Sequence, residues 1–226
     1  MRYAARVVDA AAPRTPLEEP AASCSYLDRL MRRKSFEALW PLFAHAQKPA
    51  KEMTESYSAL AHLRPYMREP GSLRVVHVGD GAHCRTGALF SLKSRADNIS
   101  VDPEVNVPLV EAWRDRFGVH GLRWRKASIF EVAAELNALP PMPTLVTFVH
   151  AHVSVDDVLR SLHWDAAFSL SCCLPGKQTS RAHAVAQRGT DASVLSSGRS
   201  YEVLVNERAG GRSSAVPSSL APHRVG

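Results

Sequence analysis

The sequence predicts an α/β protein built on a doubly wound, mostly parallel sheet, and three observations favour this class. Between residues 73 and 171, short apolar runs alternate five times with segments of helical periodicity, which is the pattern of a parallel sheet flanked by helices on both faces. With 226 residues, the chain is long enough for one sizeable core. Its 45% hydrophobic and 22% charged residues are ordinary for a globular domain.

A leader and a helical extension precede this region. Residues 1–22 are rich in Ala and Pro and show no periodicity, so we expect a flexible leader. The extension covers residues 23–70. Apolar residues recur at mostly helical spacing over 23–47, with an interruption at Pro41, which predicts one bent helix or two short ones. A further helix is predicted over 51–67 and is stopped by an Arg-Glu-Pro-Gly-Ser run.

Residues 71–207 form the predicted sheet domain. The helix that begins at Ser128 carries Glu131 three residues on, as in a capping box. The strands before the C-terminal part are predicted over 73–79, 98–102, 122–127, 144–150 and 166–171. The helices between them are predicted over 85–94, 107–118, 128–139 and 154–162.

The C-terminal part is less regular. Residues 200–207 predict a final strand, and the segment 191–197 is its expected pairing partner. Residues 208–226 have the composition of a disordered tail.

Charge and cysteine usage narrow the class of protein. The net charge of +6 and the isoelectric point near 9.4 suit a polyanionic partner such as RNA or DNA. Solvated surface arginines would give the same excess of positive charge, and both interpretations stay open. The four cysteines are too few and too irregularly spaced for a disulfide scaffold, so we expect reduced thiols.

No apolar run approaches the roughly 18 residues that a membrane helix needs. The N-terminus lacks the apolar stretch of a secretory signal. We therefore expect no membrane association and an intracellular protein, either cytoplasmic or nuclear.

The turn after the first predicted strand has the features of a ligand-binding loop. Gly79 and Gly81 would let the backbone approach a ligand closely. Asp102 ends the next strand, where a carboxylate can accept both hydroxyl hydrogens of a ribose. The third glycine of a dinucleotide fingerprint is replaced by Cys84, so hydride chemistry is not favoured.

This layout resembles the Rossmann-like, S-adenosylmethionine-dependent methyltransferases. Their first motif is an acidic residue followed by x-Gly-x-Gly-x-Gly, and an acidic residue ends their second strand; the corresponding segment here is residues 77–83. The resemblance implies that His77, Gly79, Asp80 and Gly81 contact S-adenosylmethionine and that Asp102 holds its ribose.

Two positions depart from this motif. His77 stands in place of the usual acid, and a buried, hydrogen-bonded core histidine is the alternative for it. His83 stands in place of the third glycine. A tight strand-to-helix turn without any ligand remains the alternative for the motif as a whole.

Residues 145–177 resemble a subset of these enzymes that includes some tRNA 2'-O-methyltransferases. In that subset the fourth strand ends in His-Ala-Cys-Gly and the fifth in Pro-Cys-Cys. The matching segments here are His150-Ala151-His152 and Ser171-Cys172-Cys173, in which His152 replaces a cysteine and Ser171 a proline. The resemblance spans residues 73–177. It points to His150 or His152 as a general base, since imidazole titrates near neutral pH.

A zinc site is the sharper alternative for the same region. If the strands follow the common order of this fold, six thiol and imidazole side chains gather at one sheet edge, where they could ligate zinc. Their spacing matches no zinc signature, so no metal ligand is assigned. The six residues are His83, Cys84, His150, His152, Cys172 and Cys173.

Adenine recognition in this fold usually falls to an acidic residue after the third strand. This chain offers Ser128 there instead. The sequence therefore predicts a methyltransferase that uses S-adenosylmethionine, with RNA as the leading acceptor. A catalytically inactive scaffold of the same fold and a zinc-binding protein are the alternatives.

Overall fold

The computed structural model describes residues 25–32, 36–67, 73–171 and 179–207. The predicted leader (1–22) and tail (208–226) lie outside the described residues. None of the helices within these ranges is long and apolar enough to cross a membrane.

A seven-stranded sheet forms the centre of the molecule, in the order β3-β2-β1-β4-β5-β7-β6. Every neighbouring pair is parallel except the pairs of β7 with β5 and with β6. The predicted fold class is therefore confirmed. The strands are β1 (Arg74–Val78), β2 (Asp97–Val101), β3 (Leu122–Arg125), β4 (Thr144–Val149), β5 (Ala166–Leu170), β6 (Ala184–Thr190) and β7 (Ser200–Val205).

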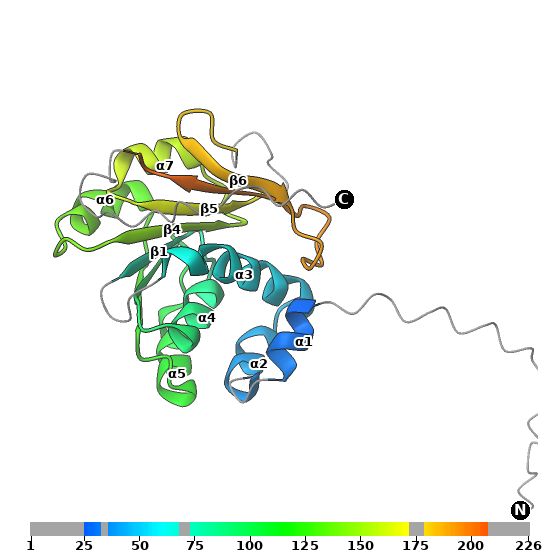
Figure 1. Cartoon of the computed structure of the whole chain (residues 1–226). Coiled ribbons are helices and arrows are strands. Elements are labelled where there is room, and N and C mark those ends of the chain that lie inside the picture. The colour runs from blue at the N-terminus through cyan, green and yellow to red at the C-terminus, as the bar shows by residue number, and fades with distance from the viewer. Residues whose placement is uncertain (1–24, 33–35, 68–72, 172–178, 208–226) are drawn as a thin grey trace, which may run out of the picture.

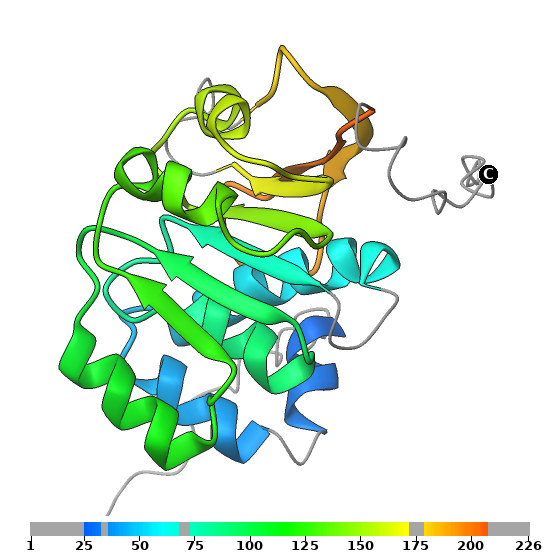
Figure 2. The ribbon, with the colours of Figure 1, turned by 90° about the vertical axis from the view of Figure 1, so that its left-hand side faces the viewer.

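Helices cover both faces of the sheet (Figure 1), and Figure 2 shows the same layers after a quarter turn. Both faces of the central strands are therefore buried, and all five residues of β1 are buried. Val75 joins the core beneath the N-terminal helices, whereas Val76 joins the core beneath α6 and α7. On one side lie α1 (Ser25–Met31), α2 (Phe36–Ala44), α3 (Pro49–Leu63), α4 (Arg85–Lys93) and α5 (Val107–Phe117); on the other lie α6 (Ile129–Asn137) and α7 (Val155–Ser161).

The predicted helical extension is part of this layered fold. Two short helices, α1 and α2, stand where one bent or two short helices were expected, but Pro41 lies inside α2 and does not end it. Because proline lacks an N–H, the short helix α2 loses one intrahelical hydrogen bond at Pro41. The longer helix α3 packs against β4, β5 and α4, so the extension covers the sheet directly.

The pairing partner of the last strand was predicted wrongly. The partner is β6, and residues 191–197 lie in the loop between β6 and β7. The prediction failed because β6 is an edge strand whose residues are mostly exposed, so it lacks the apolar alternation that marks a half-buried strand. The final strand, β7, lies within the predicted range 200–207.

Candidate functional site

The candidate site lies where the strand order of the parallel sheet reverses. β1 and β4 are neighbours, and the chain leaves them in opposite directions across the sheet. Ligands of doubly wound sheets bind beyond the carboxyl ends of the strands at such a point. Gly79 follows β1, Asp102 follows β2 and His150 follows β4, so the fold brings these three predicted residues to one edge.

The two glycines of the first turn have different surroundings. Both adopt the left-handed conformation, with φ of 67° at Gly79 and 69° at Gly81. A Cβ on Gly79 would lie 2.9 Å from the Cα of Ala151, whereas a Cβ on Gly81 would meet no atom within 4 Å. Gly79 therefore allows the β1 and β4 loops to pack closely, and Gly81 faces open space that a ligand can enter.

Asp102 is joined directly to the glycine turn. Its Oδ2 accepts a hydrogen bond from the Gly81 N–H at 2.9 Å, and its Oδ1 accepts one from the Glu104 N–H at 2.8 Å. The side chain is buried, at 9% exposure. A carboxylate has about four lone-pair sites, so these two bonds fix its orientation and still leave acceptor capacity for a ribose hydroxyl.

The Asp80 carboxylate is directed into the protein. Its Oδ1 accepts from the Thr86 N–H at 2.8 Å, and its Oδ2 accepts from the Gly87 N–H at 2.8 Å and from the Ser100 hydroxyl at 2.6 Å. Asp80 thus supplies the negative charge at the N-terminus of α4, the position that a pyrophosphate takes in dinucleotide-binding folds. This arrangement disfavours a phosphate-bearing ligand beside α4 and leaves only the Asp80 backbone for direct ligand contact.

The structure corrects the assignment of His77 to the cofactor-binding set. His77 is fully buried in β1, with Nδ1 2.9 Å from the Thr147 hydroxyl and Nε2 3.2 Å from Oδ1 of Asn98. Burial lowers the pKa of its imidazole despite the opposing effects of Asp80 and Asn98. Because both ring nitrogens have protein partners in the core, His77 matches the buried, hydrogen-bonded alternative.

His150 ends β4 in an unusual conformation and contacts the N-terminal helix α3. Its φ is 57°, a left-handed value that costs energy for a non-glycine residue. Its Nε2 lies 2.5 Å from Oε1 of Glu55 and 3.3 Å from Nζ of Lys51. A strained backbone conformation persists only where neighbouring groups stabilise it. Here Lys51 and Glu55 of α3 contact the imidazole of His150.

Glu55 is a buried carboxylate between two nitrogen groups. Its side chain is 1% exposed, and Nζ of Lys51 lies 3.0 Å from Oε1. Burial acts to raise the pKa of Glu55, but His150 and Lys51 outweigh it and hold the pKa below its ordinary value. Glu55 is therefore ionised at neutral pH and can stabilise a positive charge on His150.

Lys51 and Glu55 were not predicted from the sequence to belong to the site. A lysine and a glutamate four residues apart on a helix form an ordinary surface pair in most proteins. Their distance from His150 along the chain exceeds 90 residues, so no local pattern joins the three. Only the packing of α3 across β4 brings them together.

The remaining predicted residues lie at the same edge or near it. His152 is exposed in the segment between β4 and α7. Ser128 begins α6 with the predicted capping box: its N–H donates to Oε2 of Glu131 at 2.7 Å, and its hydroxyl oxygen accepts from the Phe130 N–H at 3.4 Å. Phe130 itself is 51% exposed, so the start of α6 presents an aromatic ring to solvent.

The expected cluster of thiols and imidazoles does not form among its described members. His83 stacks on Trp113 of α5, with ring centroids 5.6 Å apart. Cys84 is fully buried, and burial raises the pKa of its thiol. Within the described ranges, no three His, Cys, Asp or Glu side chains are placed to hold a metal ion. Cys172 and Cys173 lie outside the described residues.

Comparison with known proteins supports the fold. No family model and no curated protein matches the chain. A glutamate-to-glutamine mutant of MtNAS in complex with S-adenosylmethionine is 14% identical, with a TM-score of 0.51, and the match covers 80% of this chain and 75% of that chain. MtNAS in complex with MTA and tNA is 13% identical, with a TM-score of 0.49 and coverage of 80% and 73%.

A proposed O-methyltransferase from Nostoc punctiforme is 14% identical, with a TM-score of 0.48, and the match covers 73% of this chain and 59% of that chain. At these identities the likeness concerns the fold alone. The sheet order and the MtNAS structure agree on the class of fold: the chain has a Rossmann-like α/β fold, which it shares with MtNAS.

Proposed function

We propose that this protein is an S-adenosylmethionine-dependent methyltransferase whose cofactor binds at the carboxyl edge of β1 and β2. One observation carries the proposal: the open, left-handed turn at Gly81 is hydrogen-bonded to the Asp102 carboxylate at the point where the strand order reverses. A turn with free space and an oriented carboxylate beside it are what an adenosyl group with its ribose diol requires.

The charges at the turn suit this cofactor better than a dinucleotide. Asp80 already fills the anion position at the N-terminus of α4, so a pyrophosphate there would meet a carboxylate. S-adenosylmethionine carries no phosphate, and its sulfonium and amino group are positive, so the same carboxylate attracts it. In this proposal Gly79 and Gly81 flank the cofactor, Asp102 holds the ribose, and Ser128 and Phe130 border the adenine.

His150 is the proposed general base. S-adenosylmethionine supplies an electrophilic methyl group, and the protein needs at most one base to take a proton from the acceptor. Its Nε2 lies beside both Oε1 of Glu55 and Nζ of Lys51, so the ring stands next to a buried carboxylate that favours its protonated form. Glu55, 2.5 Å from Nε2, then stabilises the imidazolium that forms when His150 accepts the proton, as the carboxylate of a catalytic triad does. His152 is retained as the second candidate base.

Calorimetric titration with S-adenosylmethionine tests the cofactor site. We expect the wild-type protein to bind with micromolar affinity and D102N to bind at least about tenfold more weakly, because one acceptor oxygen becomes a donor amide. D115N is the matched control, since Asp115 is 72% exposed on α5. A folded wild-type protein that binds no S-adenosylmethionine would instead support the inactive scaffold.

The acceptor is a separate question. RNA stays a prediction that rests on the net charge and on the resemblance of residues 145–177 to tRNA methyltransferases. Transfer of a tritiated methyl group from S-adenosylmethionine to total RNA, to total protein and to a small-molecule extract compares the three acceptor classes. Loss of transfer in H150Q, or in H152Q, identifies the base.

A further inference from the structure

The α-carboxylate of S-adenosylmethionine needs a partner that the side chains of the glycine turn do not supply. This group lies at the amino-acid end of the cofactor, three carbon atoms away from the sulfonium. A carboxylate that leaves water needs a cation or several N–H donors to replace its hydration. The turn instead carries the carboxylates of Asp80 and Asp102, which repel a third negative charge.

Backbone N–H groups beside the turn are already engaged within the protein. Those of Thr86 and Gly87, in the first turn of α4, donate to Asp80. The N–H of Gly81 donates to Asp102. A helix N-terminus is otherwise the usual place for an anion in a fold of this kind. Since Asp80 takes that place, we expect a side-chain cation to bind the α-carboxylate.

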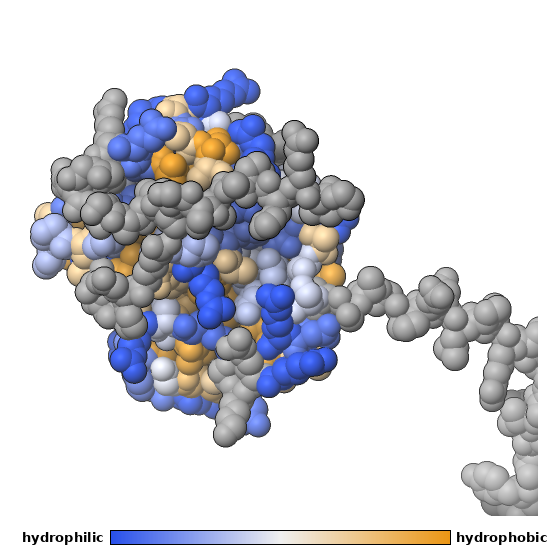
Figure 3. Space-filling view, viewed as in Figure 1, coloured by the Kyte–Doolittle hydropathy of each residue, from blue (hydrophilic) through white to orange (hydrophobic). Residues whose placement is uncertain are grey.

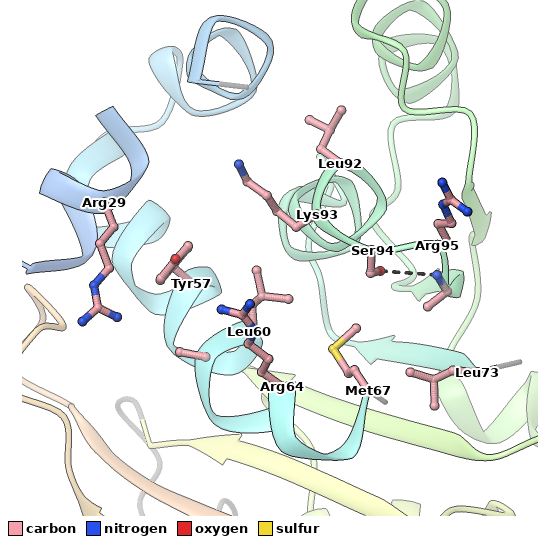
Figure 4. Close-up of a pocket in the computed structure, with 12 residues that line it drawn as sticks. Arg29, Tyr57, Leu60, Arg64, Met67, Leu73, Leu92, Lys93, Ser94 and Arg95 are labelled. Carbon is pink, nitrogen blue, oxygen red and sulfur yellow. Dashed lines mark hydrogen bonds between the residues drawn. The ribbon is translucent and has the colours of Figure 1, made fainter. Parts of the chain in front are cut away.

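Cations at the amino-terminal edge of the sheet are too far from the turn. Figure 3 shows hydrophilic side chains among hydrophobic ones over α1, α3 and α4, so an exposed cation does not by itself mark a site. Arg29, Arg64 and Arg95 line a cavity next to the starts of β1 and β2 (Figure 4). The five residues of β1 separate that edge from the turn, which is roughly 16 Å of strand.

Two cations at the carboxyl edge are not suited to the α-carboxylate either. Arg85 begins α4, but its guanidinium extends toward α2 and α3, where Nε donates to the carbonyl of Leu42 at 2.9 Å and Nη1 donates to Glu52 at 2.5 Å. Lys126 follows β3 and lies two residues before Ser128. Ser128 borders the proposed adenine position, at the other end of the cofactor from its carboxylate.

Lys51 of α3 lies beside the proposed methyl-transfer centre. Its Nζ is 3.3 Å from Nε2 of His150, at the end of β4. The next residue, Ala151, packs so closely on Gly79 that a Cβ on the glycine would lie 2.9 Å from its Cα. Lys51, the end of β4 and the turn after β1 are therefore neighbours. Because the reacting methyl group must come near His150, the carboxylate, three carbons from the sulfur, comes within reach of Lys51.

The ammonium group of Lys51 has the capacity to bind a ligand. It carries three N–H donors. In the described chain it contacts the Glu55 carboxylate, at 3.0 and 3.1 Å, and Nε2 of His150. The Lys51 side chain is 29% exposed, whereas that of Glu55 is 1% exposed. Glu55 therefore holds the ammonium from its buried side, and the exposed side is open to a ligand.

We propose that Lys51 binds the α-carboxylate of S-adenosylmethionine, so that α3 of the N-terminal extension recognises the amino-acid end of the cofactor. The inference rests on the proposed function, because it concerns the same cofactor site. An ammonium group between two carboxylates, that of Glu55 and that of the ligand, attracts both and keeps them apart. Lys51 is thus a cofactor-binding residue, and its role differs from that of the base His150.

Calorimetric titration of the full chain with two adenosyl compounds tests this role. S-adenosylhomocysteine carries the complete amino-acid end, and 5'-methylthioadenosine lacks it. We expect S-adenosylhomocysteine to bind the wild-type protein at least about tenfold more tightly, because a hydrogen bond between charged groups contributes that much affinity. K51M should weaken S-adenosylhomocysteine binding at least about tenfold and leave 5'-methylthioadenosine binding unchanged, which also shows that the variant is folded.

Two further variants control for charge and position. K51R keeps the positive charge and should retain part of the affinity for S-adenosylhomocysteine. K48M removes an exposed lysine just before the same helix and should leave the binding of both compounds unchanged.

The outcomes separate this inference from the proposed function. A folded wild-type protein that binds neither compound would contradict the cofactor site itself, and the role of Lys51 with it. If both compounds bind with equal affinity, or if K51M weakens both to the same extent, the cofactor site stands and the role of Lys51 is overturned. Unchanged binding of S-adenosylhomocysteine to K51M would overturn that role as well.

Discussion

Nε2 of His150 lies 2.5 Å from Oε1 of Glu55, and this pair joins the end of β4 to the N-terminal helix α3. The carboxylate is buried, and the histidine is held at a φ of 57°. The helices that precede the sheet domain therefore supply part of the candidate site.

Glu55 is expected to act on catalysis through His150. E55Q keeps the shape of the side chain but removes the charge that stabilises an imidazolium, so we expect methyl transfer to fall by about ten- to a hundredfold. Affinity for S-adenosylmethionine should stay unchanged. The pH dependence of the rate should shift in E55Q and not in E37Q, a control on exposed Glu37 of α2. An unchanged rate and pH profile in E55Q would rule out this role.

Asp191 is expected to fasten the loop between β6 and β7 to the N-terminal helices. Its Oδ2 accepts from the Tyr26 hydroxyl at 2.7 Å and the Ser58 hydroxyl at 2.6 Å, and Nε2 of His62 lies 3.2 Å away. Removing a buried, multiply bonded carboxylate costs about 3–5 kcal/mol. D191A should therefore lower the free energy of unfolding in urea by about that amount, and S197A, on the same loop, should change it little.

The pH dependence of stability should reveal the contribution of the Asp191 carboxylate. Burial acts to raise the pKa of Asp191, but hydrogen bonds from His62, Ser58 and Tyr26 outweigh it and lower that pKa. A lowered pKa gives stability that is present above the unfolded value and lost as the pH falls below about 4. Urea unfolding between pH 5 and pH 2.5 should therefore show a steeper loss in the wild-type protein than in D191N. Parallel curves would count against the assignment.

The two glycines of the first turn make a matched pair. G79A and G81A both place a Cβ in the left-handed region, at a cost of roughly 1–2 kcal/mol. Only G79A also brings that Cβ within 2.9 Å of Ala151. We expect G79A to lower the unfolding free energy more than G81A. If the two variants unfold alike, the β1 and β4 loops are not packed as described.

His77 should affect stability and not cofactor binding. H77A leaves Asn98 and Thr147 with unsatisfied polar groups in the core, at about 1–3 kcal/mol for each such group. The variant should therefore melt at a lower temperature than the wild-type protein. Its affinity for S-adenosylmethionine, measured well below the melting temperature, should match the wild-type value. A large loss of affinity in a folded H77A protein would return His77 to the cofactor site.

The sequence predicted the regular parts of the molecule well, since short apolar runs and helical periodicity depend on neighbouring residues. The capping box at Ser128 was correct for the same reason. The failures depend on distant contacts. The contacts of the Asp80 carboxylate with the start of α4 were not predicted, because they depend on how the turn folds back. The proximity of Glu55 to His150 follows only from the packing of α3 over β4.

α3 spans about 22 Å at 1.5 Å per residue and reaches both edges of the sheet. Its first half carries Lys51 and Glu55 against His150, while Tyr57 and Leu60 line a cavity at the opposite edge, next to the starts of β1 and β2. A single helix therefore contacts both the candidate site and this cavity. Thermodynamic linkage then requires that any occupant of the cavity which shifts α3 alter affinity at the far site, and that the far ligand alter the first affinity by the same factor.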